Sequence, residues 1–132
     1  MLQKSLNQNK QSLVSQSPDS NFGSKAENIA SGLLLQNGYK IIDRNFHSRF
    51  GEIDIVALKD NTLIFIEVKA RQSLRYGMPE EAVTRQKLYK IRRTGEYYSI
   101  LHPELPKKLR IDVVALIIED EQVVSSKIII VD

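Results

Sequence analysis

The sequence predicts a single α/β domain with a central mixed sheet flanked by helices, in the order α-β-β-β-α-β-β. Two segments have helical periodicity, and five apolar runs rich in Ile, Val, Leu or Phe have the length of strands. The chain has 132 residues, 42% of them hydrophobic, which suits one domain with its own core.

The first helix is expected to begin at Ser24 and to run through Leu35. Ile29 and Leu33 share one of its faces, and Gly38 supplies a C-terminal stop signal. Residues 1–21 are rich in Gln, Asn and Ser without a sustained apolar period, so they are expected to form a disordered N-terminal tail. The folded domain is therefore expected to span residues 22–132.

The remaining elements follow from apolar runs and turn signals. A long second helix is expected because Pro79 suits a first helical position and the next two residues are acidic. The predicted ranges are strands at 39–46, 52–58 and 62–69, a helix at 79–101, and strands at 109–118 and 123–131.

Composition restricts the chemistry. The chain has no cysteine and only two histidines, so any metal ion must be held mainly by oxygen ligands. No secretory signal or membrane span is recognisable, and the protein is expected to be cytoplasmic with no membrane partner. Residues 69–110 contain eleven Lys or Arg and four Glu, a net charge of about +7. Such a charge suits a polyanion as binding partner, and a solvated charged surface is an equal alternative.

A hairpin carries the most specific signal. Asp60-Asn61 has the composition of a two-residue type I′ turn, so opposed residues should have numbers that sum to 121. Asp54 then faces Glu67, and Lys69 faces Glu52 on the same side of the hairpin. Two opposed carboxylates repel each other unless a cation binds or one of them is protonated.

An ion-pair network on a solvent-facing side is the structural alternative for this hairpin. Val56 and Phe65 argue against it, because they place large apolar groups on the same side as the charges. Both faces of the hairpin are therefore expected to be covered, and charges at a covered face suggest a functional site.

Asp54 followed across a hairpin by Glu67-Val68-Lys69 resembles the PD-(D/E)xK motif of restriction-endonuclease-like nucleases. The longer strings at residues 44–46, 51–57 and 65–71 resemble the YraN-type family of predicted endonucleases, which in turn resembles archaeal Holliday-junction resolvases. The proline of the motif's name is absent, since Ile53 precedes Asp54.

This resemblance implies a restriction-endonuclease-like domain over residues 22–132 that hydrolyses nucleic-acid phosphodiesters with Mg²⁺ or Mn²⁺. Structured or branched DNA is the expected substrate, DNA is favoured over RNA, and a homodimer would suit a junction. Asp54, Glu67, the backbone carbonyl of Val68 and Glu27 are the expected metal ligands. Asp54, Glu67, Lys69 and Glu27 are the expected catalytic residues, with Lys69 orienting the nucleophile or neutralising developing charge.

Several alternatives stay open on the sequence. Ser24 and Glu27 also form a capping-box pattern, which competes with metal binding for the Glu27 carboxylate. Lys87 lies on or beside the apolar face of the second helix, so it either extends to solvent or contacts phosphate. The candidate nucleic-acid contacts are Arg71, Arg75, Lys87, Lys90 and Arg93. The alternative function is a non-catalytic nucleic-acid-binding module of the same fold.

Overall fold

The structure is a computed structural model that describes the backbone of residues 18–131 and the side chains of residues 22–131. Its helices and strands are α1 (Pro18–Gln36), β2 (Lys40–Ser48), β3 (Gly51–Lys59), β4 (Thr62–Arg71), the short 3-10 helix η1 (Pro79–Ala82), α2 (Arg85–Leu101), β5 (Leu109–Glu119) and β6 (Gln122–Ile130). The α/β class and the order of the seven predicted elements are confirmed.

The N-terminal boundary differs from the expectation. Helix α1 begins at Pro18, inside the segment predicted as a tail and six residues before the predicted start at Ser24. Most of the predicted tail, residues 1–17, lies outside the described residues.

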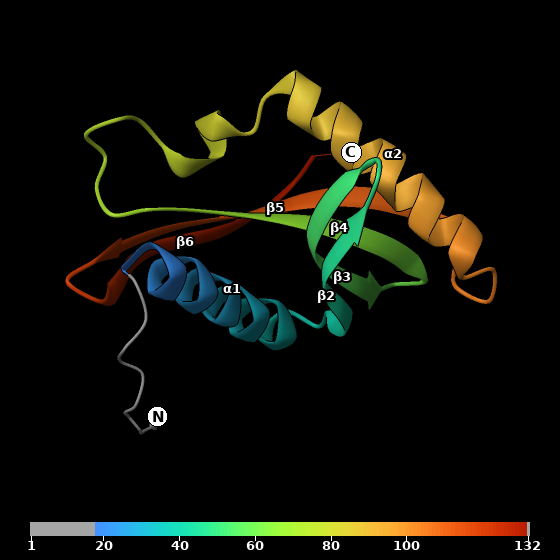
Figure 1. Cartoon of the computed structure of the whole chain (residues 1–132). Helices are drawn as coiled ribbons and strands as arrows, with labels where there is room; N and C mark the ends of the chain where they lie inside the picture. Colours follow the sequence, from blue (N-terminus) through green and yellow to red (C-terminus); the bar gives the residue numbers. More distant parts are fainter. Residues whose placement is uncertain (1–17, 132) are drawn as a thin grey trace.

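The five strands form one mixed sheet in the order β2-β3-β4-β5-β6. All neighbouring strands are antiparallel except β4 and β5, which are parallel. Parallel pairing needs a long crossover between the strands, and η1 and α2 supply it here. Helices α1 and α2 lie on opposite sides of the sheet (Figure 1). The hairpin of β3 and β4 is therefore in the interior of the sheet and covered on both faces, as expected.

Alternating residues of the two inner strands build separate cores on these faces. Ile55 and Ile64 pack with Ala30 and Leu34 of α1, whereas Phe65 packs with residues of α2. The approach of α2 is close, since a Cβ atom on Gly95 would lie 2.5 Å from the Phe65 ring. The helix backbone thus rests directly on the ring.

The predicted turn is confirmed, and the predicted register is confirmed for the five residue pairs next to it. Asp60 and Asn61 have φ values of 51° and 57°, the left-handed conformation that a type I′ turn requires at both positions. The paired positions run from Lys59 opposite Thr62 to Ile55 opposite Ile66, and each pair sums to 121 as expected.

The prediction of one long helix from Pro79 was wrong. The 3-10 helix ends at Ala82, Val83 is extended with φ −91° and ψ 92°, and α2 begins anew at Arg85. Thr84 explains the second start, because its hydroxyl accepts a hydrogen bond from the Lys87 backbone N–H at 3.1 Å. This cap sets where Lys87 lies in the first turn of α2.

Candidate active site

The site begins where β3 and β4 separate. The paired positions of the two strands end at Ile55 and Ile66. Asp54 is the residue before Ile55 on β3, and its carboxylate accepts a hydrogen bond from the Val68 backbone N–H at 2.8 Å. A side chain thus takes the place of a backbone acceptor, which fixes the Asp54 carboxylate beside β4.

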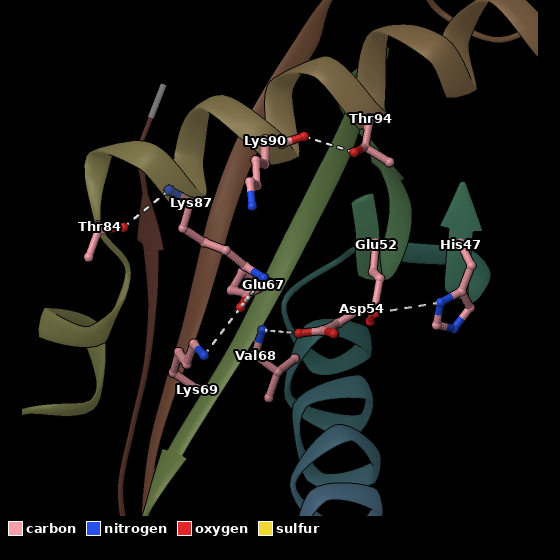
Figure 2. Close-up of polar contacts among 10 residues, drawn as sticks. All are labelled: His47, Glu52, Asp54, Glu67, Val68, Lys69, Thr84, Lys87, Lys90 and Thr94. Atoms are coloured by element: carbon pink, nitrogen blue, oxygen red, sulfur yellow. Dashed lines mark hydrogen bonds and ion pairs between the residues drawn. The ribbon is translucent and has the colours of Figure 1, made fainter. Parts of the chain in front are cut away.

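Glu67 is a buried acid, with 4% of its surface exposed. Its Oε2 atom lies 3.5 Å from Nζ of Lys69 on the same strand and 3.8 Å from Nζ of Lys87 on α2. Figure 2 shows the two lysines reaching the carboxylate from β4 and from the helix. Both contacts are longer than an ordinary hydrogen bond, so the ammonium groups are attracted to Glu67 without being locked to it.

The pKa of Asp54 is raised to about 7. The largest cause is burial, followed by the nearby charge of Glu67, and Glu27 adds to the rise. The hydrogen bond from Val68 and the charge of Lys87 oppose it. The predicted repulsion between acids across the hairpin is therefore present, and it shows as the raised pKa of Asp54.

Glu27 reaches the same pocket from α1. Its Oε1 atom is ion-paired with Nη2 of Arg44 on β2 at 3.3 Å, and the same guanidinium donates to Oδ1 of Asn28 at 3.0 Å. The capping-box alternative is wrong, because α1 begins at Pro18 and Ser24 lies inside the helix. Arg44 was missed from the sequence, since only the packing of α1 beside β2 places it next to Glu27.

The three acids and the two lysines line one open pocket of about 340 Å³, together with residues from the first half of α1. Its lining residues are Phe22, Gly23, Ala26, Glu27, Asp54, Glu67, Val68, Lys69, Ala70 and Lys87. A larger hollow of about 680 Å³ lies elsewhere, beside the β5–β6 turn. We favour the smaller pocket, because the larger one contains no buried acid.

The predicted position of Glu52 was wrong. Instead of facing Lys69 beside Asp54, it is exposed and lies 3.8 Å from Nδ1 of His47 on β2. The two labelled side chains lie together, apart from Glu67 and Lys69, in Figure 2. The register across the hairpin cannot be extended past Ile55, because β3 and β4 separate there while β3 stays paired with β2.

Among residues 22–131, no three His, Asp or Glu side chains are arranged as a ready metal cage. The ion pairs explain this, since Glu27 is turned toward Arg44 while Glu67 is approached by two lysines. A cation in the pocket would have to compete with these ammonium and guanidinium groups.

The five candidate nucleic-acid contacts are only partly brought together. Lys87 lines the pocket, and Lys90 and Arg93 are exposed on the following turns of α2. Arg71 ends β4 and Arg75 lies in the loop after it, and neither lines the pocket. The Nε atom of Arg71 is buried and has no hydrogen-bond partner among the described residues.

The sequence profile described as uncharacterised protein family UPF0102 matches residues 26–116, which include all the acids and both lysines of the pocket. The chain belongs to the UPF0102 family. This match confirms the resemblance to YraN-type proteins.

Individual UPF0102 relatives align over most of their length. A UPF0102 protein from Syntrophomonas wolfei is 41% identical over 99 residues, covering 75% of this chain and 86% of the relative. Another, from Caldicellulosiruptor bescii, is 43% identical over 98 residues, covering 74% of this chain and 82% of the relative.

Among solved structures, the fold is similar to part of an EndoMS-dsDNA2 complex. The similarity has a TM-score of 0.36 and 19% sequence identity, covering 66% of this chain and 34% of the other. This chain spans about a third of that one. Within residues 18–131, no helix combines the length and apolar character needed to cross a membrane.

Proposed function

We propose that this UPF0102 protein is a metal-dependent nuclease that hydrolyses phosphodiester bonds in nucleic acid, with structured or branched DNA as its substrate. The observation that carries the proposal is the pocket itself. It places a buried glutamate, a half-buried aspartate and two lysines from separate elements around one open space. Such costly burial of like charges is typical of functional sites.

The donor set fits Mg²⁺ or Mn²⁺. Both ions prefer carboxylate and carbonyl oxygens, and burial together with the charge of Glu67 already raises the pKa of Asp54. Asp54, Glu67 and the backbone carbonyl of Val68 would hold the ion, with Glu27 completing the site directly or through water. A bound ion would supply positive charge that stabilises charge developing on the scissile phosphate.

The two lysines have separate origins and complementary tasks. Lys69 is two residues after Glu67 on β4, so its ammonium group stays beside the acids and can orient the attacking water. Lys87 approaches from α2 and can turn from Glu67 toward a phosphate oxygen. Lys87 is thus a phosphate contact in this proposal rather than a lysine that merely extends to solvent.

The test is Mn²⁺-dependent cleavage of labelled duplex, single-stranded and four-way-junction DNA by the native chain and by D54N and E67Q. We expect the native chain to cut, with the junction preferred, and both variants to lose at least about a hundredfold in rate, because each removes the negative charge of a proposed ligand. E52Q is the matched control, since it changes the charge of an exposed acid two residues from Asp54 that does not line the pocket.

The possible results separate the nuclease from the binding module. Equal cleavage by the native chain, D54N and E67Q would point to a contaminating nuclease and defeat the proposal. Binding by all chains, measured by fluorescence anisotropy, without cleavage in Mn²⁺ or Mg²⁺ would instead support a non-catalytic nucleic-acid-binding module.

A further inference from the structure

Two arginines lie over one aromatic ring outside the pocket. The Cζ atoms of Arg49 and Arg93 are 5.0 Å and 5.3 Å from the centre of the Phe50 ring, within the range of a cation–π interaction. Arg49 and Phe50 form the turn between β2 and β3, whereas Arg93 belongs to α2. Guanidinium groups from two separate elements are thereby brought to one place.

The ring that holds them is itself fixed. Phe50 packs against Tyr97 of α2 with ring centroids 5.2 Å apart. Beside it, Gly51 has φ 147°, and a Cβ atom there would lie 2.9 Å from the hydroxyl of Thr94. The turn is therefore pressed against α2 at a position that tolerates only glycine, which limits where the arginine of the turn can move.

Both guanidinium groups are available to an anion. Arg49 and Arg93 are exposed, and neither is ion-paired with a carboxylate within residues 22–131. The one side-chain hydrogen bond of Arg93 in this range goes from Nη1 to the hydroxyl of Tyr89 at 3.1 Å. Arginine presents several further N–H donors in a planar fork that matches phosphate oxygens.

The position of the pair relates it to the pocket. Lys87, Lys90 and Arg93 recur every three residues along α2, so their side chains form one inclined row that starts at Lys87, next to Glu67. Six residues of α-helix span about 9 Å. On a duplex whose axis runs along α2, each strand advances about 3.4 Å per nucleotide, so this length corresponds to about two or three nucleotides.

We propose that Arg49 and Arg93, held by Phe50, form a phosphate-binding clamp for the nucleic-acid strand two or three nucleotides from the scissile phosphate. This proposal rests on the proposed function for the reference position, and it adds a specific contact point on the strand. Phe50 is a positioning residue, because it acts through the two guanidinium groups.

The first test measures DNA binding in EDTA, where no cleavage can occur. Fluorescence anisotropy against salt concentration is compared for the native chain, R49A, R93A and the double variant. Loss of each phosphate contact should lower the slope of log K against log salt by about 0.9, hence by about 1.8 for the double variant. K107A is the control, since it removes an exposed charge on the segment before β5. Among the described residues, the Lys107 ammonium group contacts only the Pro103 carbonyl.

Phe50 is tested by F50L and F50Y. F50L removes the aromatic ring and should weaken DNA binding, as the arginine variants do. F50Y should bind DNA like the native chain, because tyrosine retains the ring face. Unfolding midpoints of all variants, measured in parallel, identify any general loss of structure. Equal weakening by F50L and F50Y, or a native slope in R49A/R93A, would overturn the clamp.

The second test locates the contact. DNA substrates with a single neutral methylphosphonate are scanned across the cleavage position, and a weakened interaction is expected two or three nucleotides away in the native chain but not in R49A/R93A. If the chain binds with the expected slopes yet never cuts, the clamp stands and the nuclease proposal fails. If the chain cuts while R49A/R93A keeps the native slope, the nuclease proposal stands and the clamp fails.

Discussion

Replacing Asp54 by asparagine tests the electrostatic cost of the pocket directly. Asparagine keeps the shape of the side chain and an oxygen that can accept the hydrogen bond from the Val68 N–H. The substitution removes only the negative charge, whose burial near Glu67 raises the pKa of Asp54 from 3.8 to about 7. We therefore expect D54N to be more stable than the native chain at neutral and alkaline pH.

The sign follows from proton binding. Between about pH 4 and pH 7 the folded chain holds a proton on Asp54 that the unfolded chain has lost, so the free energy of unfolding falls as the pH rises through this window. At about 1.4 kcal/mol per pKa unit, the shift sets an upper limit of about 4 kcal/mol on the loss. D54N lacks this group and should not show the corresponding fall.

The assay is urea unfolding of the native chain, D54N and the control E52Q at pH 5, 6, 7 and 8 in EDTA. The advantage of D54N should be smallest at pH 5 and grow to a few kcal/mol at pH 8, while E52Q follows the native chain. With Mn²⁺ at about a hundred times its dissociation constant, the native chain should gain about 2.7 kcal/mol and D54N much less. Parallel pH profiles for native and D54N would refute the reasoning.

Two further predictions concern packing and the role of Glu27. G95A should lower the free energy of unfolding by about 1–3 kcal/mol, because the new methyl group would lie 2.5 Å from the Phe65 ring. The control is G32A in the other α-helix, where the new methyl group would meet no atom within 4 Å. G32A should raise the free energy of unfolding by up to about 1 kcal/mol. R44A should strengthen Mn²⁺ binding, measured by calorimetry, because it frees the Glu27 carboxylate at a cost of less than about 1 kcal/mol in stability. Unchanged affinity in both R44A and E27Q would remove Glu27 from the ligand set.

Much of the fold was predictable because its signals are local. Strand-length apolar runs and the Asp60-Asn61 turn determined the register that the structure confirms from Lys59–Thr62 to Ile55–Ile66. The helix boundaries were less predictable. The break before α2 depends on the competition between a proline start at Pro79 and a threonine cap at Thr84, and both fit the sequence rules.

The sequence alone determined the part of the site that lies on one hairpin. Asp54, Glu67 and Lys69 are neighbours because β3 and β4 are joined by two residues, so turn chemistry is sufficient to bring them together. Only the tertiary structure decided the rest. It excluded Glu52, because the strands separate beyond Ile55.

Contacts between distant segments have no local signature. Lys87 meets Glu67 because α2 packs on one face of the sheet, and Glu27 reaches the same pocket because α1 packs on the other. The arginine pair depends in the same way on a turn and a helix more than forty residues apart, brought together by the fit of Gly51 against Thr94. Such sites are set by how covered faces pack, which no window of the sequence contains.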